Sequence, residues 1–165
     1  MKLNKTVQAA INEQINIELH SSYMYLAMAA YAEFQMFPGC AHWMRVQSRE
    51  ENGHAMRLFH FMVQRNAQIV LQAVPAPQVN FDNITSIFEE ALKAEEKVSE
   101  SINRLYQLCL DEKAYATASE LEWFLKEQVE EEHQARLVLS RFKMVKNDPA
   151  ALLELDKELM QRAGE

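Results

Sequence analysis

The sequence predicts an all-α protein: a four-helix bundle with one long crossover and a short fifth helix at its C-terminal end. The 165 residues include only three Gly and four Pro, whereas the helix-favouring Ala, Leu, Glu, Gln and Lys are abundant. Four long segments repeat apolar residues at steps of three and four, and none alternates as a strand does. The length suits one domain with its own core, and we assign residues 1–165 to it.

The first two predicted helices form a hairpin. Apolar spacing predicts the first helix over about 5–34, and Glu18 is the one charged residue on its inward stripe. Phe37-Pro38-Gly39 predicts a short turn, so the second helix, about 39–66, runs back antiparallel to the first. Glu51 and His54 lie three residues apart on the second inward stripe and therefore share one helix face.

A long connection follows the second helix. Residues 67–81 contain Pro75 and Pro77 and show no helical period. Fully extended, a segment of this length spans roughly 50 Å. A helix of about 28 residues is only roughly 42 Å long. The connection can therefore cross the whole bundle, which predicts that the second and third helices run parallel.

The second half of the chain repeats the pattern of the first. The third helix, predicted over about 83–111, carries Glu95 on its apolar stripe. The fourth, predicted over about 114–145, carries Glu131 in the same way. Asp148-Pro149 then combines a capping residue with a Pro at the first helical position. It predicts a fifth helix, about 149–162, whose leucine face we expect to pack against another subunit.

Together the four long helices predict a buried metal site. Each places one carboxylate on its inward stripe, and His54 adds an imidazole. Burying an ionised carboxylate without a partner costs several kcal/mol. Four carboxylates carry four negative charges, which two divalent cations would neutralise. Oxygen-rich ligands with one imidazole and no thiolate suit Fe or Mn better than structural Zn.

A metal-free helical interaction protein is the alternative. Any one of these Glu residues taken alone fits a solvated helix face, and only their joint occurrence favours a metal. The metal-free alternative predicts that replacing Glu18 or Glu51 by Ala stabilises the fold. The metal site predicts instead that added divalent ions raise stability.

Composition also restricts location and partners. A net charge of −7 argues against a nucleic-acid partner. No apolar run approaches the length of a membrane span, and no apolar segment follows Met1 as in a secretory signal. Cys40 and Cys109 have no metal-type spacing and suit a reducing compartment. We therefore expect a cytoplasmic protein without membrane or nucleic-acid partners.

Four segments combine into a recognisable pattern: Asn16-Ile17-Glu18-Leu19, Glu50-Glu51-x-x-His54-x-x-Arg57, Trp123-x-x-x-Glu127-Gln128-x-Glu130-Glu131 and Leu155-Asp156-Lys157-Glu158-Leu159. They resemble the corresponding segments of non-haem bacterial ferritins, and the resemblance extends over essentially the full length of the chain. It implies a 24-subunit homo-oligomeric shell that oxidises Fe(II) with O2 or hydrogen peroxide and stores ferric mineral inside.

The resemblance also implies a ligand set for the di-iron centre. By position, Glu18, Glu51 and His54 resemble the ligands of the first iron. Glu51 would bridge to a second iron held by Glu95 and Glu131. A third iron site, found in bacterial members, would share one of these ligands; its residues are Glu50, Glu127, Glu130 and Glu131.

Other positions complete this expected site. Gln128 resembles a residue that hydrogen-bonds the centre, and Tyr25 a nearby one-electron donor, with Trp123 a weaker redox candidate. Bacterioferritins bind haem through a Met directly after the bridging Glu, but Asn52 stands there, so we expect no haem. A rubrerythrin-like di-iron oxidase or peroxidase is a further alternative, although its usual Cys-x-x-Cys iron module is absent.

Overall fold

The computed structural model describes residues 3–163, and residues 1–2 and 164–165 of the predicted domain lie outside this range. Within it the chain forms helices and no strands, so the predicted all-α class is confirmed. No helix in this range has an apolar stretch long enough to cross a membrane. The elements are α1 (Lys5–Phe34), α2 (Pro38–Gln64), α3 (Ile84–Asp111), α4 (Tyr115–Val145) and α5 (Pro149–Leu159).

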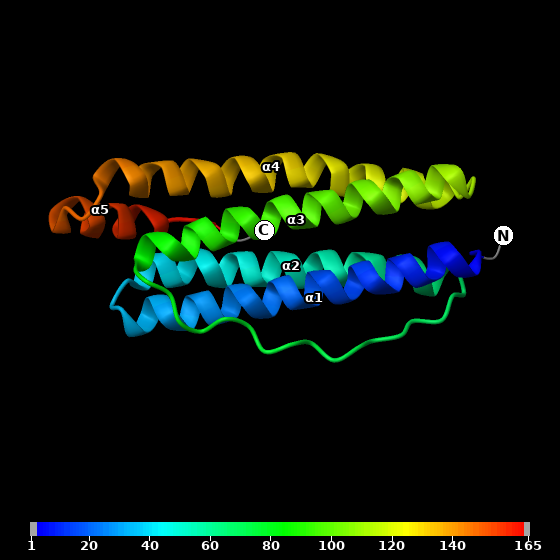
Figure 1. Cartoon of the computed structure of the whole chain (residues 1–165), viewed down its shortest axis with the longest axis horizontal. Helices are drawn as coiled ribbons and strands as arrows, with labels where there is room; N and C mark the ends of the chain where they lie inside the picture. Colours follow the sequence, from blue (N-terminus) through cyan, green and yellow to red (C-terminus); the bar gives the residue numbers. More distant parts are fainter. Residues whose placement is uncertain (1–2, 164–165) are drawn as a thin grey trace.

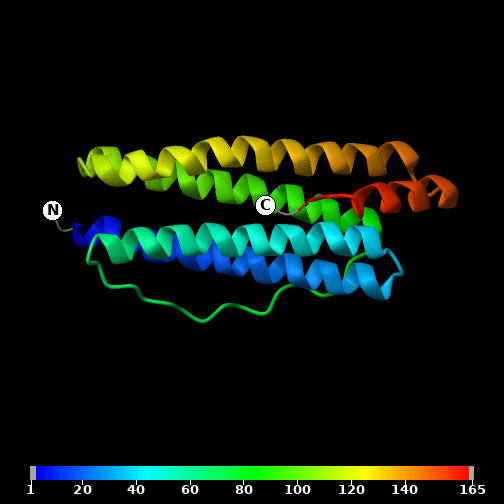
Figure 2. The same ribbon diagram turned by 180° about the vertical axis from the view of Figure 1, so that it is seen from behind.

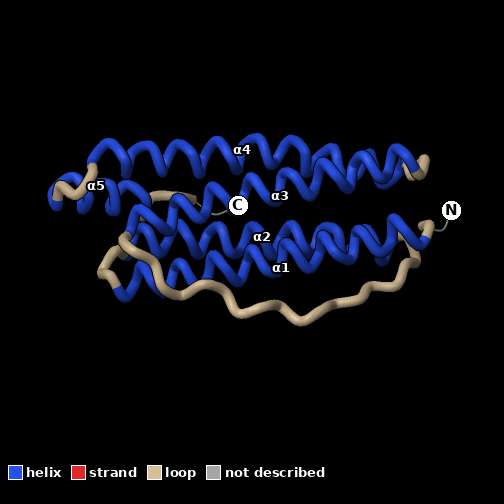
Figure 3. Tube along the Cα trace, in the orientation of Figure 1, coloured by secondary structure: helices blue, strands red, loops and turns tan. Residues whose placement is uncertain are grey.

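The long helices pack as two antiparallel hairpins, α1 with α2 and α3 with α4 (Figure 1). Residues 65–83 connect the hairpins and run along the whole length of the first one (Figure 3). As a result α3 begins at the same end of the bundle as α2, and the two helices run parallel, as the length of this segment predicts. The view from behind shows the same order, with α5 at one end (Figure 2).

The connection between the hairpins is fixed to α1 by two asparagines one helical turn apart. The side chain of Asn12 accepts from the backbone N–H of Val70 at 2.9 Å and donates to the carbonyl of Gln68 at 3.1 Å. Asn16 accepts from the N–H of Gln72 at 2.8 Å. These bonds satisfy backbone groups that have no sheet or helix partner, and they hold the segment against the bundle.

Side-chain caps define where three helices begin. Asn4 accepts from the N–H of Val7 at 2.8 Å at the start of α1. Asn83 forms a reciprocal capping box with Ser86 at the start of α3. Asp148 caps α5 with Pro149 behind it, as the sequence predicts.

The apolar core is divided into two clusters with a polar layer between them. One cluster lies toward the α5 end and contains Phe88 and Phe142, whose rings stack at 4.5 Å. The other contains Ile11, Leu58 and Phe124. In every long helix the inward Glu lies between the residues of the two clusters. The bundle therefore carries its buried charge near the middle, with apolar packing on both sides.

The fifth helix is held tightly on its own chain. The side chain of Asp156 accepts from the backbone N–H of Cys40 at 2.8 Å, and a Cβ at Gly39 would lie 1.7 Å from the carbonyl oxygen of Asp156. Leu155 and Leu159 are buried in the core of the same chain, so the expectation that this face packs on another subunit is wrong. The helix also ends at Leu159, three residues before its predicted end.

Candidate metal centre

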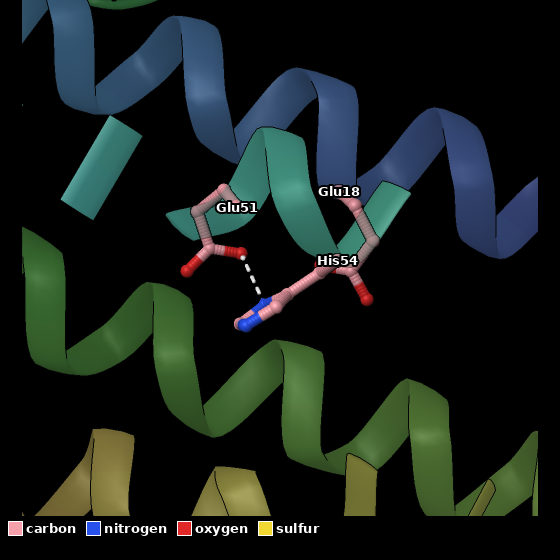
Figure 4. A group of neighbouring side chains, drawn as sticks. All are labelled: Glu18, Glu51 and His54. Atoms are coloured by element: carbon pink, nitrogen blue, oxygen red, sulfur yellow. Dashed lines mark ion pairs between the residues drawn. The ribbon is translucent and has the colours of Figure 1, made fainter. Parts of the chain in front are cut away.

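The polar layer consists of one carboxylate from each long helix and one imidazole. The exposed fractions of Glu18 and Glu51 are 0%, and those of Glu95, Glu131 and His54 do not exceed 5%. Glu18 from α1 and Glu51 and His54 from α2 offer ligand atoms within 4.8 Å of one another. Figure 4 shows the Glu51 carboxylate pointing at the His54 ring. All five residues predicted to hold the two irons thus lie in one buried layer.

Three atoms in this layer have no hydrogen-bond partner among the described residues: Oε2 of Glu18, Oε2 of Glu51 and Nδ1 of His54. Nδ1 of His54 is 3.5 Å from Oε2 of Glu51, which is an ion-pair distance. Leaving buried polar atoms unpaired is costly. A divalent cation among them would contact all three, and carboxylate oxygens with one imidazole are donors that suit Fe(II). The residues present therefore fit the implied metal.

Two glutamines that we did not predict donate to the carboxylates. Nε2 of Gln14 lies 2.7 Å from Oε1 of Glu18. Nε2 of Gln47 lies 3.1 Å from Oε1 of Glu51 and 2.7 Å from Oε2 of Glu131. Each glutamine precedes the Glu of its own helix by four residues, so it lies directly beneath that carboxylate. This repeated Gln-x-x-x-Glu spacing is the sequence signal that could have identified both.

Glu95 has its own pair of donors. The buried hydroxyl of Tyr25 donates to Oε1 of Glu95, and Nε2 of Gln128 lies 3.3 Å from Oε2. Burial and then the charges of Glu51 and Glu131 raise the pKa of Glu95 well above its usual value. Tyr25 and Gln128 therefore both contact the buried layer through Glu95, the carboxylate from α3.

Burial and neighbouring charges shift the pKa values of Glu18, Glu131 and His54. Burial raises the pKa of Glu18 to about 8 and that of Glu131 to about 7, with the charge of Glu51 adding to both shifts. Burial alone would lower the pKa of His54, but the Glu51 carboxylate and the charges of Glu18 and Glu131 together outweigh burial and raise the pKa to about 9. Without a cation, protons reduce the negative charge of this layer, and bound metal would displace them.

The residues expected at a third site are only partly brought together. Glu127 and Glu131 offer ligand atoms within 4.8 Å of a nitrogen of His54, which we predicted only for the first iron. Glu50 is instead paired with Arg162, with Nη2 2.6 Å from Oε2. Glu130 is exposed and belongs to neither of the groups that could hold a metal.

A surface pocket of about 430 Å³ reaches His54, and its lining includes Glu50, Arg57 and Trp123. The ring of Trp123 lies edge-on to the imidazole, with centroids 5.4 Å apart. The guanidinium of Arg57 lies 4.2 Å from the centre of the Trp123 ring, and its Nε is 2.7 Å from a carboxylate oxygen of Glu120. This pocket gives solutes a route to the imidazole side of the layer.

The family model and the sequence relatives that match this chain all belong to one family. A family model described as a ferritin-like domain matches residues 8–145. A bacterial non-heme ferritin of Staphylococcus aureus (strain USA300) is 34% identical over 160 residues, covering 97% of this chain and 96% of that protein. A bacterial non-heme ferritin of Staphylococcus epidermidis is also 34% identical, over 161 residues, covering 98% of this chain and 97% of its own.

Solved structures agree with the sequence relatives. An open-pore ferritin from the hyperthermophilic archaeon Archaeoglobus fulgidus superposes with a TM-score of 0.97 at 37% identity, covering 99% of this chain and 100% of that one. A closed form engineered from the Archaeoglobus ferritin gives a TM-score of 0.98 at 38% identity, with the same coverage. The likeness extends over the whole bundle and the fifth helix.

Proposed function

Because the chain belongs to the ferritin family, we propose that it is a ferroxidase that oxidises Fe(II) with O2 or hydrogen peroxide and stores the product as ferric mineral. The observation that carries this proposal is the set of three buried ligand atoms on Glu18, Glu51 and His54 that have no hydrogen-bond partner among the described residues. Such atoms are expensive to bury unless a cation pairs with them. Fe(II) enters as the substrate of this site.

Each side chain of the metal centre has its own role in this proposal. Glu18 and His54 hold one Fe(II), Glu95 and Glu131 hold the other, and Glu51 lies between them. Two Fe(II) ions together release two electrons, enough to reduce one O2 to hydrogen peroxide with two protons. The side-chain amides of Gln14 and Gln47 donate hydrogen bonds to two of these carboxylates, those of Glu18 and Glu51, and so fix their orientation. Fixing the ligands in advance keeps the two metal positions close together and leaves room for the oxidant.

Tyr25 and Gln128 support the Glu95 side of the centre. The Tyr25 hydroxyl donates to one oxygen of Glu95 and the Gln128 amide approaches the other. These contacts favour the ionised carboxylate, because a hydrogen bond donated to a charged group stabilises that form. We propose that both residues position Glu95 for iron, and that Tyr25 is also close enough to supply an electron.

Storage requires more than one chain. We propose that the chain assembles into the hollow 24-subunit shell of its family and works in the cytoplasm. Its likeness to the Archaeoglobus ferritin over 99% of the chain supports this assembly, because the elements that a shell would use are all present. Light scattering or electron microscopy of the purified protein would measure the number of subunits.

Aerobic addition of Fe(II) to the metal-free protein tests the oxidation itself. We expect a rapid rise in ferric absorbance that saturates near two or three irons per subunit, followed by slow mineral growth. Glu95→Gln should abolish the rapid phase. The neighbouring exposed residue supplies the matched control, Glu96→Gln, which should retain it. A wild-type trace identical to that of buffer alone would refute the proposal.

A further inference from the structure

The residues after α5 continue alongside α2 toward the middle of the bundle, as the red segment of Figure 2 shows. They are held there by contacts of Arg162. Nε2 of His42 donates to the carbonyl oxygen of Arg162 at 2.8 Å. The guanidinium carbon lies 4.4 Å from the centre of the Trp43 ring, and Nη2 lies 2.6 Å from Oε2 of Glu50. One side chain near the C-terminus thus reaches a residue expected to bind a third iron.

This ion pair lies mostly out of solvent. The side chains of Arg162 and Glu50 are only 13% and 15% exposed, and Nη1 of Arg162 is buried without a hydrogen-bond partner within residues 3–163. A guanidinium that leaves one nitrogen unpaired gains less than its full set of hydrogen bonds. A cation that Glu50 can coordinate with better geometry could therefore replace Arg162 in this ion pair.

The pair lies close to the metal centre. Glu50 lines the pocket that reaches His54, and its charge contributes to the raised pKa of Glu131. Glu127 and Glu131 already form a possible cation position with His54. A cation there would need further negative ligands, and Glu50 is nearby but is neutralised by Arg162.

We propose that Arg162 is an internal competitor for the outer cation position, an inference that rests on the proposed function. Its guanidinium pairs with Glu50 while that position is empty. A cation bound by Glu127 and Glu131 draws the Glu50 carboxylate away and releases Arg162 from Glu50 and Trp43. The inner ligands are not affected directly, since Glu18 and Glu51 take their hydrogen bonds from Gln14 and Gln47. Arg162 therefore acts as a positioning residue that weakens cation binding at the outer position by holding Glu50, while Glu131 and His54 are shared with the inner centre.

Calorimetric titration of the assembled metal-free protein with Zn(II), which is not oxidised, tests the competition. In Arg162→Gln we expect the weakest binding step to tighten about tenfold, the scale of one charge-assisted hydrogen bond, while the tighter steps stay the same. Glu50→Gln should remove that weakest step. Arg141→Gln, which breaks the ion pair of Arg141 with Glu158 in α5, is the matched control and should leave the isotherm unchanged. An unaltered or weaker outer step in Arg162→Gln would overturn the proposal.

Fluorescence of Trp43 tests the displacement without relying on the fold of an Arg162 variant. In a Trp123→Phe background Trp43 is the single tryptophan. We expect its emission to change during the last Zn(II) equivalent, when the guanidinium leaves the ring, and to stay constant during the earlier ones. Emission that is constant throughout would refute the release. Failure of iron oxidation would leave both Zn(II) results intact, so the two proposals can fail separately.

Discussion

Nε2 of Gln47 in α2 lies 2.7 Å from Oε2 of Glu131 in α4, so a neutral amide connects the two hairpins at the level of the metal centre. The same nitrogen lies 3.1 Å from Oε1 of Glu51. One glutamine thereby donates to two buried carboxylates from opposite halves of the bundle. In the metal-free protein this amide provides part of the positive potential that a cation would otherwise supply.

Replacing this amide tests its contribution. We expect Gln47→Leu to lower the free energy of unfolding of the metal-free protein by about 1–3 kcal/mol, because buried carboxylate oxygens lose their donor. Zn(II) should narrow this difference in the free energy of unfolding, since the cation would neutralise the same two carboxylates, Glu51 and Glu131. Thermal unfolding at pH 8 with and without Zn(II) measures both effects. The exposed Gln134→Leu is the control, and an equal loss in both conditions would contradict this role.

Stability of the metal-free protein should fall as the pH rises. The folded-state pKa values of Glu18 and Glu131 are raised from 4.5 to about 8 and about 7, so the folded state binds more protons than the unfolded state in this window. Their stabilising contribution is complete below about pH 4.5 and is lost as the pH passes through the folded pKa. His54, raised from 6.5 to about 9, has the same sign. Each group contributes up to about 1.4 kcal/mol per pH unit.

Unfolding midpoints between pH 5.5 and 9 check this slope. Glu18→Gln removes one of the titrating groups, so its midpoint should fall less steeply over the same range. Saturating Zn(II) should reverse the trend, because protons then compete with the metal. Parallel slopes for the wild-type protein and Glu18→Gln would show that Glu18 does not hold a proton in the folded state.

Two glycines of α2 should respond to Ala in opposite directions. A Cβ at Gly39 would lie 1.7 Å from the backbone oxygen of Asp156, so α5 has to move and lose its bond to Cys40. We expect Gly39→Ala to cost about 1.5–3 kcal/mol, the scale of a hydrogen bond to a charged group. At Gly53 a Cβ meets no heavy atom of the described residues within 4 Å, so Gly53→Ala should gain up to about 1 kcal/mol of helix stability. Chemical unfolding of both variants measures the contrast, and equal effects would contradict it.

Tyr25→Phe separates two possible roles of the Tyr25 hydroxyl. If the hydroxyl mainly keeps Glu95 ionised, its loss raises the pKa of Glu95 and slows Fe(II) oxidation more at pH 6 than at pH 8. We expect about a tenfold loss at pH 6, equivalent to about 1.4 kcal/mol. Stopped-flow ferric absorbance measures it, with Tyr31→Phe, which loses a bond to the Phe81 carbonyl, as control. An equal loss at both pH values would favour electron donation by Tyr25 instead.

Much of the fold can be predicted from local features of the sequence. The inward stripes predict all four long helices within a few residues, and the length of residues 67–81 predicts that α2 and α3 run parallel. Helix periodicity and segment length depend only on neighbouring residues, so both can be inferred before any tertiary contact is known. The same stripes predict which carboxylates are buried, including Glu18 and Glu95.

The features that the sequence did not predict depend on contacts between distant segments. The predicted fifth helix is three residues too long, and the chain instead turns after Leu159 and sends Arg162 across to Glu50. That contact joins residues 112 positions apart, and no local pattern encodes it. Glu130 lies next to Glu131 in sequence, but about 100° further around the helix, which leaves it exposed. The helical stripe thus correctly selects Glu131 as the inward residue, whereas Glu130 was expected at the third iron site only from the resemblance.

The crossover also affects how the centre is assembled during folding. Each hairpin carries only part of the donor set: Glu18, Glu51 and His54 on the first, Glu95 and Glu131 on the second. Hairpins form from contacts near in sequence, whereas joining them brings mutually repelling carboxylates together. The segment fixed by Asn12 and Asn16 is thus a tether that sets the effective concentration of one hairpin for the other. Divalent ions should consequently strengthen the association of the two halves in a chain cut between Val74 and Val79.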